Sequence, residues 1–488
     1  MALTPPRRVA CAAALLLLIQ LGLWWPGVAM FDTIGQFSQV LAGAYDDWHP
    51  PIMARLWAAL HPLGPGGTPM LVVQAAAYWL GLGLIAGALA RDARVRAGWA
   101  MIVLGALPLF VAWQSVILKD AQMLGALVLA VGIVARARLG GRRLSAPALV
   151  AVVVLLAYAA LVRTNAVFAV VPLGVMLLPG RRRRTYRAGA VAVLTLAVLA
   201  VSPTINHRLF GAEPTSVGNT LPLFDLAGIA HFAGDDGVLS PDERALIVAR
   251  HCYQPFFWDP IGSPSRCGAI SVRFEDAPPG LLKRGWVSAI LRHPAGYARH
   301  RLAHLNATER WLVPAEWTSA APPAGSERNT IGLGAPGRVA RPIVTAAGWM
   351  ATSPLGWPIM WVVVAGGVAA IALGTARTAI RDLALALAVS ALALEASFAV
   401  VSIASDLRYH LWPMLASALA AILIASEGRV PRRLAQGGGL ALALMIMAGL
   451  IARATLPSPP PGYAAMLAWD GGAGQAGTPA PQPVPGIR

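Results

Sequence analysis

The chain has 488 residues, of which 57% are hydrophobic and only 12% are charged. Soluble domains carry about 25% charged residues, so this composition excludes an ordinary soluble globular protein. The net charge of +17 does not indicate nucleic-acid binding, because the arginines fall in short clusters between apolar runs, as they do in the cytoplasmic loops of membrane proteins.

The apolar runs predict an all-α polytopic membrane protein. Runs of about 20 residues, long enough to cross a bilayer, recur along the chain, and only helices can span a membrane with such runs. The pattern predicts about eleven transmembrane helices. The predicted spans cover residues 9–30, 69–90, 98–114, 121–137, 146–162, 166–180, 188–204, 354–374, 383–403, 411–426 and 434–453.

The charges between the spans predict their orientation. If the N-terminal Pro-Pro-Arg-Arg lies in the cytoplasm, every arginine cluster between spans falls on the cytoplasmic side as well. The clusters lie at residues 91–96, 136–143, 181–187, 377–381 and 429–433. The first span resembles a signal peptide, but its length, its Trp24 and Trp25 and the missing cleavage site favour an uncleaved anchor.

Four segments follow from this topology. Residues 1–204 form an N-terminal transmembrane module, and residues 205–350 form an extracytoplasmic domain that is mainly α or α+β. Residues 351–453 form the C-terminal transmembrane helices. Residues 454–488 are rich in Pro, Gly and Ala, cannot bury a core and are predicted to be disordered.

The large external loop contains a pair of cysteines and a pair of histidines, and each pair has two interpretations. Cys252 and Cys267 form a disulfide or remain two buried thiols. His300 and His304 have the spacing of a metal-binding pair on a helix, but no third ligand is evident nearby. We therefore favour an amphipathic helix at the membrane surface, with Arg299 and Arg301 contacting lipid phosphate.

Charged and polar side chains gather at the external ends of the spans. The first external loop, residues 31–68, contains Asp32, Gln36, Asp46, Asp47 and His49. Three short turns contain Lys119 and Asp120, then Arg163 and Asn165, then Asp406, Arg408, Tyr409 and His410. A basic residue at the membrane centre costs about 2.5–3.5 kcal/mol on insertion scales. One such turn is explained by local pairing or snorkelling, but three turns together favour a shared polar site that binds an anion.

The segment FDTIGQFSQVLAGAYDDWHPPIM, from Phe31 to Met53, resembles the first external loop of the GT-C superfamily of membrane glycosyltransferases. It is most similar to protein O-mannosyltransferases and aminoarabinose transferases of lipid A. Those enzymes have an acid after the first span and an Asp-x-His-Pro-Pro motif that opens an interfacial helix. Asp32 matches the first acid and DWHPP the motif, whereas Thr33 stands where the family often has Glu. The turns WQSVILKD, LVRTN and SDLRYHLWP are similar to those of a bacterial GT-C-like family.

The resemblance implies an enzyme of the bacterial inner membrane with a periplasmic active site. It would transfer a sugar from a polyprenyl-phosphate donor to an extracytoplasmic acceptor. Asp32 is the expected general base, supported by Asp47, with Asp46 a weaker candidate. Arg408, Lys119 and Arg163 are expected to bind the donor phosphate. The other expected substrate-binding residues are Gln36, Asp120, Asn165, Tyr409 and His49. His49 would also cap or order the interfacial helix.

The expected partners are therefore the lipid-linked donor, the acceptor and the bilayer, with no nucleic acid. No cofactor is expected: some relatives use a divalent cation, but the sequence offers no strong ligand set. Three alternatives remain open. They are an O-antigen polymerase or ligase using Arg292, His293, Arg299 and His300 of the large loop, a transporter or lipid flippase, and a non-enzymatic assembly scaffold.

Overall fold

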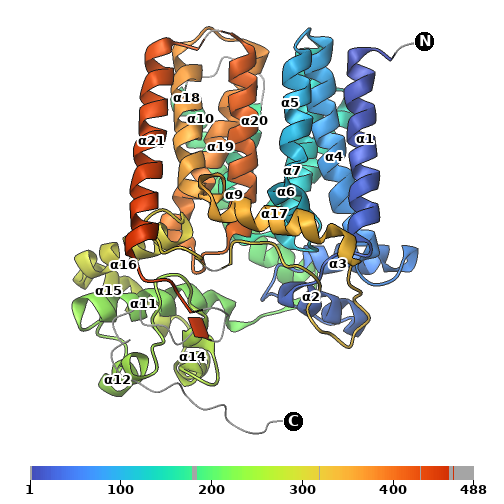
Figure 1. The fold of residues 1–488 in the computed structure, drawn as a ribbon. Coiled ribbons are helices and arrows are strands. Elements are labelled where there is room, and N and C mark those ends of the chain that lie inside the picture. The colour runs from blue at the N-terminus through green and yellow to red at the C-terminus, as the bar shows by residue number, and fades with distance from the viewer. Residues whose placement is uncertain (1–2, 178–183, 318, 429, 461–464, 467–488) are drawn as a thin grey trace. The chain divides into compact units, whose positions relative to one another are not determined.

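The computed structural model describes residues 3–177, 184–317, 319–428, 430–460 and 465–466 (Figure 1). The arginines at positions 181–183, the end of the sixth predicted span and most of the predicted tail lie outside these residues.

Among the described residues, seven helices are long and apolar enough to cross a membrane, or eight if a bent pair is one span. Five of the seven are α1 (Pro5–Trp24), α4 (Thr68–Arg91), α7 (Lys119–Leu139), α19 (Ala379–Val401) and α21 (Arg432–Thr455). The other two continue through a neighbouring turn: Thr185–Leu209 comprises α10 (Arg184–Thr204) with the turn after it, and Leu407–Ser426 comprises α20 (Leu411–Ser426) with the turn before it. The bent pair is α5 (Val95–Gly105) and α6 (Pro108–Gln114), and the shorter apolar helices are α8 (Ala146–Val162), α9 (Val167–Leu177) and α18 (Pro358–Gly374). The class of all-α membrane protein is confirmed, and the number of about eleven spans stays a prediction.

The remaining elements are short. They are α2 (Phe31–Ala42), α3 (Ile52–Leu60), α11 (Thr220–Ala233), α12 (Pro241–Ala249), α13 (Asp259–Gly262), α14 (Gly268–Glu275), α15 (Leu281–Arg292), α16 (Pro294–Thr308) and α17 (Arg341–Thr352). Single turns of 3-10 or π-helix are η1 (His61–Leu63), η2 (Thr164–Ala166), η3 (Ile205–Leu209), η4 (Ser216–Asn219), η5 (Arg338–Ala340), η6 (Pro354–Gly356) and η7 (Leu407–His410). Within the described residues, β1 (Tyr45–Asp46) and β2 (Ala212–Glu213) form one parallel pair.

The chain divides into two compact units. The first comprises Met1–Val217, Thr308–Trp311 and Ser319–Met447, and the second comprises Gly218–Ala307, Leu312–Thr318 and Ala448–Arg488. The four segments expected from hydropathy concern membrane topology and stay a prediction.

The first unit contains two groups of packed helices. Helix α4 packs against α1, α5 and α7, and α19 packs against α9, α18 and α20. Helix α20 also contacts α5 and α7, which joins the groups. Small residues allow the closest approach: a Cβ placed on Gly132 of α7 would lie 2.6 Å from the carbonyl oxygen of Gly81 in α4. Figure 1 shows α2, α3 and α17 at the end of this unit opposite the N-terminus of α1.

The second unit is built around the buried Asp225. Its carboxylate accepts hydrogen bonds from Trp286 at 2.8 Å and His300 at 3.1 Å, and it is ion-paired with Arg301. Because Arg301 is only 5% exposed, the predicted contact of this arginine with lipid is wrong. His304 bonds elsewhere, to the backbone oxygen of Pro255 at 2.7 Å, so the two histidines do not act as a pair.

A disulfide joins Cys252 and Cys267 within the second unit. Cys252 and Cys267 are therefore covalently bonded and are not two free buried thiols.

Candidate functional site

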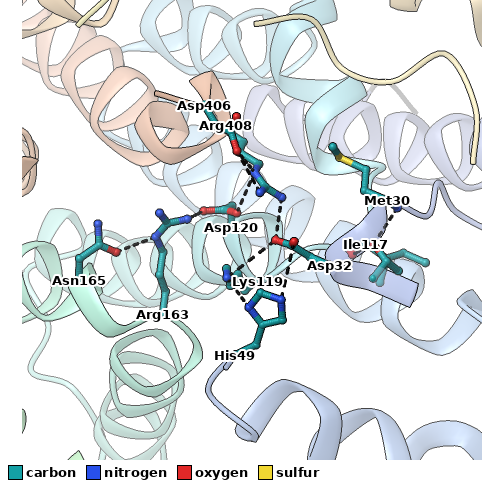
Figure 2. Close-up of polar contacts among 11 residues, drawn as sticks. Met30, Asp32, His49, Ile117, Lys119, Asp120, Arg163, Asn165, Asp406 and Arg408 are labelled. Carbon is teal, nitrogen blue, oxygen red and sulfur yellow. Dashed lines mark hydrogen bonds and ion pairs between the residues drawn. The ribbon is translucent and has the colours of Figure 1, made fainter. Parts of the chain in front are cut away.

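Three side chains from distant parts of the first unit surround the carboxylate of Asp32 (Figure 2). Arg408 Nη1 lies 3.0 Å and Lys119 Nζ 3.8 Å from Asp32 Oδ2, while His49 Nε2 lies 3.7 Å from Oδ1. The four side chains are between 9% and 15% exposed. The expected base and two of the expected phosphate-binding cations therefore share one site.

Backbone pairing places the start of α2 beside the start of α7. Val28 and Val116 form a parallel bridge just before these two helices. Thr33 then accepts a hydrogen bond from the amide of Met30 at 3.0 Å and donates one to the carbonyl of Ile117 at 2.7 Å. Thr33 is thus fully buried and joins the two helix ends.

Buried glutamines hold the irregular backbone between α6 and α7. Gln74 Nε2 donates to the carbonyls of Gln114 at 2.7 Å and Val116 at 2.9 Å, and Gln122 donates to Gln74 Oε1 at 2.9 Å. Backbone groups inside a membrane need such partners because water is absent. No role was predicted for these residues, although glutamines inside apolar spans were a usable signal. They position Lys119, which begins α7.

Asp120 connects the site to two further turns. It is ion-paired with Arg163, and its other oxygen lies 4.0 Å from Nε of Arg408 (Figure 2). Arg163 also donates to Asn165 Oδ1 at 2.6 Å, and its guanidinium lies 3.9 Å from the ring centre of Tyr409. All three predicted basic turns are therefore part of one network.

The network is electrically balanced. Asp406, whose pairing with Arg408 is one of the predicted local pairings, lies 3.0 Å from two nitrogens of Arg408. The network thus holds three carboxylates and three cations, namely Asp32, Asp120 and Asp406 with Lys119, Arg163 and Arg408. An anionic ligand would therefore have to replace a carboxylate as the partner of a cation.

The protonation of Asp32 and His49 follows from these neighbours. Burial raises the pKa of the Asp32 carboxyl, but Arg408, Lys119 and His49 outweigh it and hold the pKa well below its usual range. Burial, followed by Lys119, lowers the pKa of His49 to about 3. His49 is neutral and accepts from Lys119 through Nδ1 at 2.8 Å, so its Nε2–H faces Asp32.

The other two acids of the first loop hold the loop itself. Asp47 Oδ1 accepts from the amide and the hydroxyl of Thr215, both at 2.6 Å, and Oδ2 lies 3.3 Å from His207. Asp46 accepts from a backbone amide two residues later, at 3.0 Å. Among the contacts of the described residues, neither acid reaches Asp32.

The remaining two predicted site residues of the first loop are Gln36 and His49. Gln36 lies one helical turn after Asp32 and is 1% exposed, yet neither atom of its amide has a hydrogen-bond partner among the described residues. The expected capping role of His49 is wrong: α3 has Pro51 as its N-cap and no side-chain cap bond.

Comparison with models of known protein families finds no match for this chain, and a search of curated proteins finds no significant match. The resemblance to GT-C enzymes therefore rests on the motif residues alone.

Proposed function

We propose that this protein is a GT-C-like glycosyltransferase that transfers a sugar from a polyprenyl-phosphate donor to an extracytoplasmic acceptor. One observation carries the proposal. The carboxylate of Asp32, on the short helix α2, contacts Arg408 and Lys119. Lys119 begins α7, whereas Arg408 lies in η7 between α19 and α20. A carboxylate beside several cations provides both a proton acceptor and a binding site for the leaving phosphate.

The proposed topology has about eleven spans, counting α8, α9 and α18 as three of them. The N-terminus lies in the cytoplasm and the site faces the periplasm of a bacterial inner membrane. Figure 1 supports this orientation, since the N-terminus of α1, which carries Arg7 and Arg8, lies at the end of the first unit opposite α2. The disulfide in the second unit supports an extracytoplasmic domain, because disulfides persist in oxidising compartments.

The reaction is a single displacement at the anomeric carbon. The acceptor oxygen forms a bond to this carbon while the bond from carbon to the phosphate oxygen breaks. Asp32 takes the acceptor proton, a contribution of about 10²–10⁴ in rate. The lipid phosphate leaves with the bonding electrons, and Arg408 and Lys119 stabilise its charge. Displacement in one step inverts the configuration of the sugar.

The ion pairs of Asp32 make its strength as a base depend on whether the donor is bound. While Arg408 and Lys119 contact Asp32, its pKa stays low and it is a poor base. A donor phosphate that attracts these cations raises the pKa of Asp32 towards its ordinary value, so the base becomes effective when the donor is bound. Gln36, on the same face of α2, has amide groups available to bond a hydroxyl of the sugar or the acceptor.

The alternatives have less support. For a polymerase or ligase using the second unit, His300 is fully buried between Asp225 and Tyr253, and Arg292 donates to the backbone oxygen of Asp236 at 3.2 Å. Transporters place charges near the midplane of interrupted helices, whereas the charges described above lie at helix ends.

Two variants with opposite effects test the proposal. Asp32→Asn should lower transfer from a labelled polyprenyl-phosphate sugar by about 10²–10⁴-fold, because the base is lost. It should still bind polyprenyl phosphate, since both cations are released from the carboxylate. Arg408→Ala should weaken that binding by about 10–100-fold, which corresponds to a charged hydrogen bond of about 1.5–3 kcal/mol.

Binding is measured by native mass spectrometry of the purified full-length chain, with a polyprenol that lacks phosphate as the control lipid. Asp46→Asn serves as the matched loop variant and should retain transfer. Near-normal transfer by Asp32→Asn at equal expression would refute the base assignment.

A further inference from the structure

The first unit contains a second buried polar cluster, formed by Glu309, Glu395 and His410. One ligand atom from each residue lies within 4.8 Å of the others. The side chains are 5%, 3% and 0% exposed, respectively. They come from three separate segments, since Glu309 directly follows α16, Glu395 lies in α19 and His410 ends η7.

The carboxylates of this cluster lack sufficient partners. Glu309 Oε2 and Glu395 Oε1 are buried and have no hydrogen-bond partner among the described residues. Two ionised carboxylates at this separation repel each other strongly in a medium without water. The pair therefore requires either a shared proton or a cation between the two groups.

One of the two tautomers of His410 fits a cation at this cluster. Its Nε2 lies 2.9 Å from the hydroxyl of Thr308, and its Nδ1 lies 2.8 Å from Glu395 Oε2. If the hydroxyl accepts from Nε2–H, the lone pair of Nδ1 faces the two carboxylates. Metal-binding histidines are typically held in this way, with the second ring N–H donated to an acceptor. The ring of His410 also packs edge-on against Phe398, with 4.7 Å between the ring centres, and this contact fixes the orientation of the imidazole.

We propose that Glu309, Glu395 and His410 bind a divalent transition metal, Zn²⁺ foremost. Imidazole and carboxylate are common zinc donors, and three protein ligands leave a fourth position for water. The metal joins the segment after α16 to α19 and η7. Because η7 also carries Arg408, the same ion holds the turn that positions this arginine. The metal site itself does not depend on the proposed glycosyl transfer.

Elemental analysis of the purified full-length chain tests the site. After dialysis against metal-free buffer, we expect about one zinc per chain. Glu309→Gln and Glu395→Gln should each lose it, whereas Glu427→Gln, a matched change of an acid outside the cluster, should retain it. Thr308→Val should weaken zinc affinity by about 10–100-fold, because the hydrogen bond that orients His410 is removed.

X-ray absorption on the unmodified chain provides a measurement that needs no variant. We expect nitrogen and oxygen neighbours at about 2.0–2.2 Å with an imidazole among them and no sulfur. Three results would overturn the proposal: no zinc bound by the unmodified chain, zinc retained by both glutamine variants, or sulfur in the first coordination shell. The first of these would mean that the carboxyl groups share a proton instead.

Discussion

His49 is neutral because it lies in a largely buried position against Lys119. Its Nδ1 accepts from the ammonium at 2.8 Å, and its side chain is 11% exposed. Burial and the repulsion from Lys119 and Arg408 disfavour a protonated ring there, and together they outweigh the attraction of Asp32. At this position a histidine acts as a neutral hydrogen-bonding group that orders Lys119 and faces Asp32.

This arrangement predicts an acid-sensitive contribution to stability. The pKa of His49 falls from 6.5 to about 3 on folding, so the unfolded chain binds more protons between these values and stability decreases as the pH decreases through them. From pH 7.5 to pH 5 the loss from this residue is about 2 kcal/mol. Asp32 contributes nothing in this range, since its proton uptake lies below its ordinary pKa of 3.8.

Chemical unfolding of the detergent-solubilised chain at both pH values measures this effect. His49→Gln should lose about 2 kcal/mol less than the unmodified chain between pH 7.5 and pH 5. Equal losses in the two proteins would show that His49 is already protonated when folded.

At the residue scale, the sequence revealed the charges but not their pairings. Lys119, Arg163 and Arg408 are conspicuous because cations are rare at helix ends that are predicted to be external. Thr33 carries no such signal, whereas Glu395, an acid inside the predicted span 383–403, was a usable signal to which no role was given. Their importance depends on a carbonyl 84 positions away for the first and on a histidine 15 positions away for the second.

The bent pair of helices α5 and α6 shows how local sequence and distant partners combine. Pro108 is the first residue of α6, where proline cannot continue the hydrogen bonds of α5, and the two helices meet at 56°. After α6 the chain is irregular again until Lys119. Gln74 in α4 satisfies the carbonyls of Gln114 and Val116 in this region.

Gln74→Leu therefore should destabilise the protein. Two buried carbonyls lose their donor, at about 1–3 kcal/mol each. Gln436→Leu is the matched control, because this glutamine of α21 is exposed and its replacement should change stability little. Thermal unfolding of both variants in the same detergent measures the difference. Equal melting temperatures would contradict the role assigned to Gln74.

Hydropathy located the apolar helices, but it could not give their ends. The predicted span at 9–30 already ends at Trp24, because Pro26 follows and Val28 pairs with the chain before α7. The residues between are as apolar as the helix. An apolar run shows only that a segment avoids water, whereas the end of a helix depends on backbone partners elsewhere in the chain.

At the scale of the whole molecule, the charge pattern and the disulfide favour one orientation. Clusters of arginine keep loops in the cytoplasm, and the disulfide of the second unit favours an oxidising compartment. These two arguments are independent, since one uses the turns of the first unit and the other uses covalent chemistry in the second. Both agree with the proposed topology, in which the second unit lies outside the cytoplasm.

Cysteine labelling in intact cells tests this orientation. In a Cys11→Ser background, Lys283→Cys on an exposed position of α15 should react with a membrane-impermeant maleimide. Arg142→Cys, exposed between α7 and α8, should react only after the membrane is permeabilised, because its loop is held in the cytoplasm by positive charge. The reverse pattern would place Asp32 on the cytoplasmic side. A polyprenyl-phosphate donor presented at the periplasmic face could then not reach the carboxylate, and the proposed reaction would have to be abandoned.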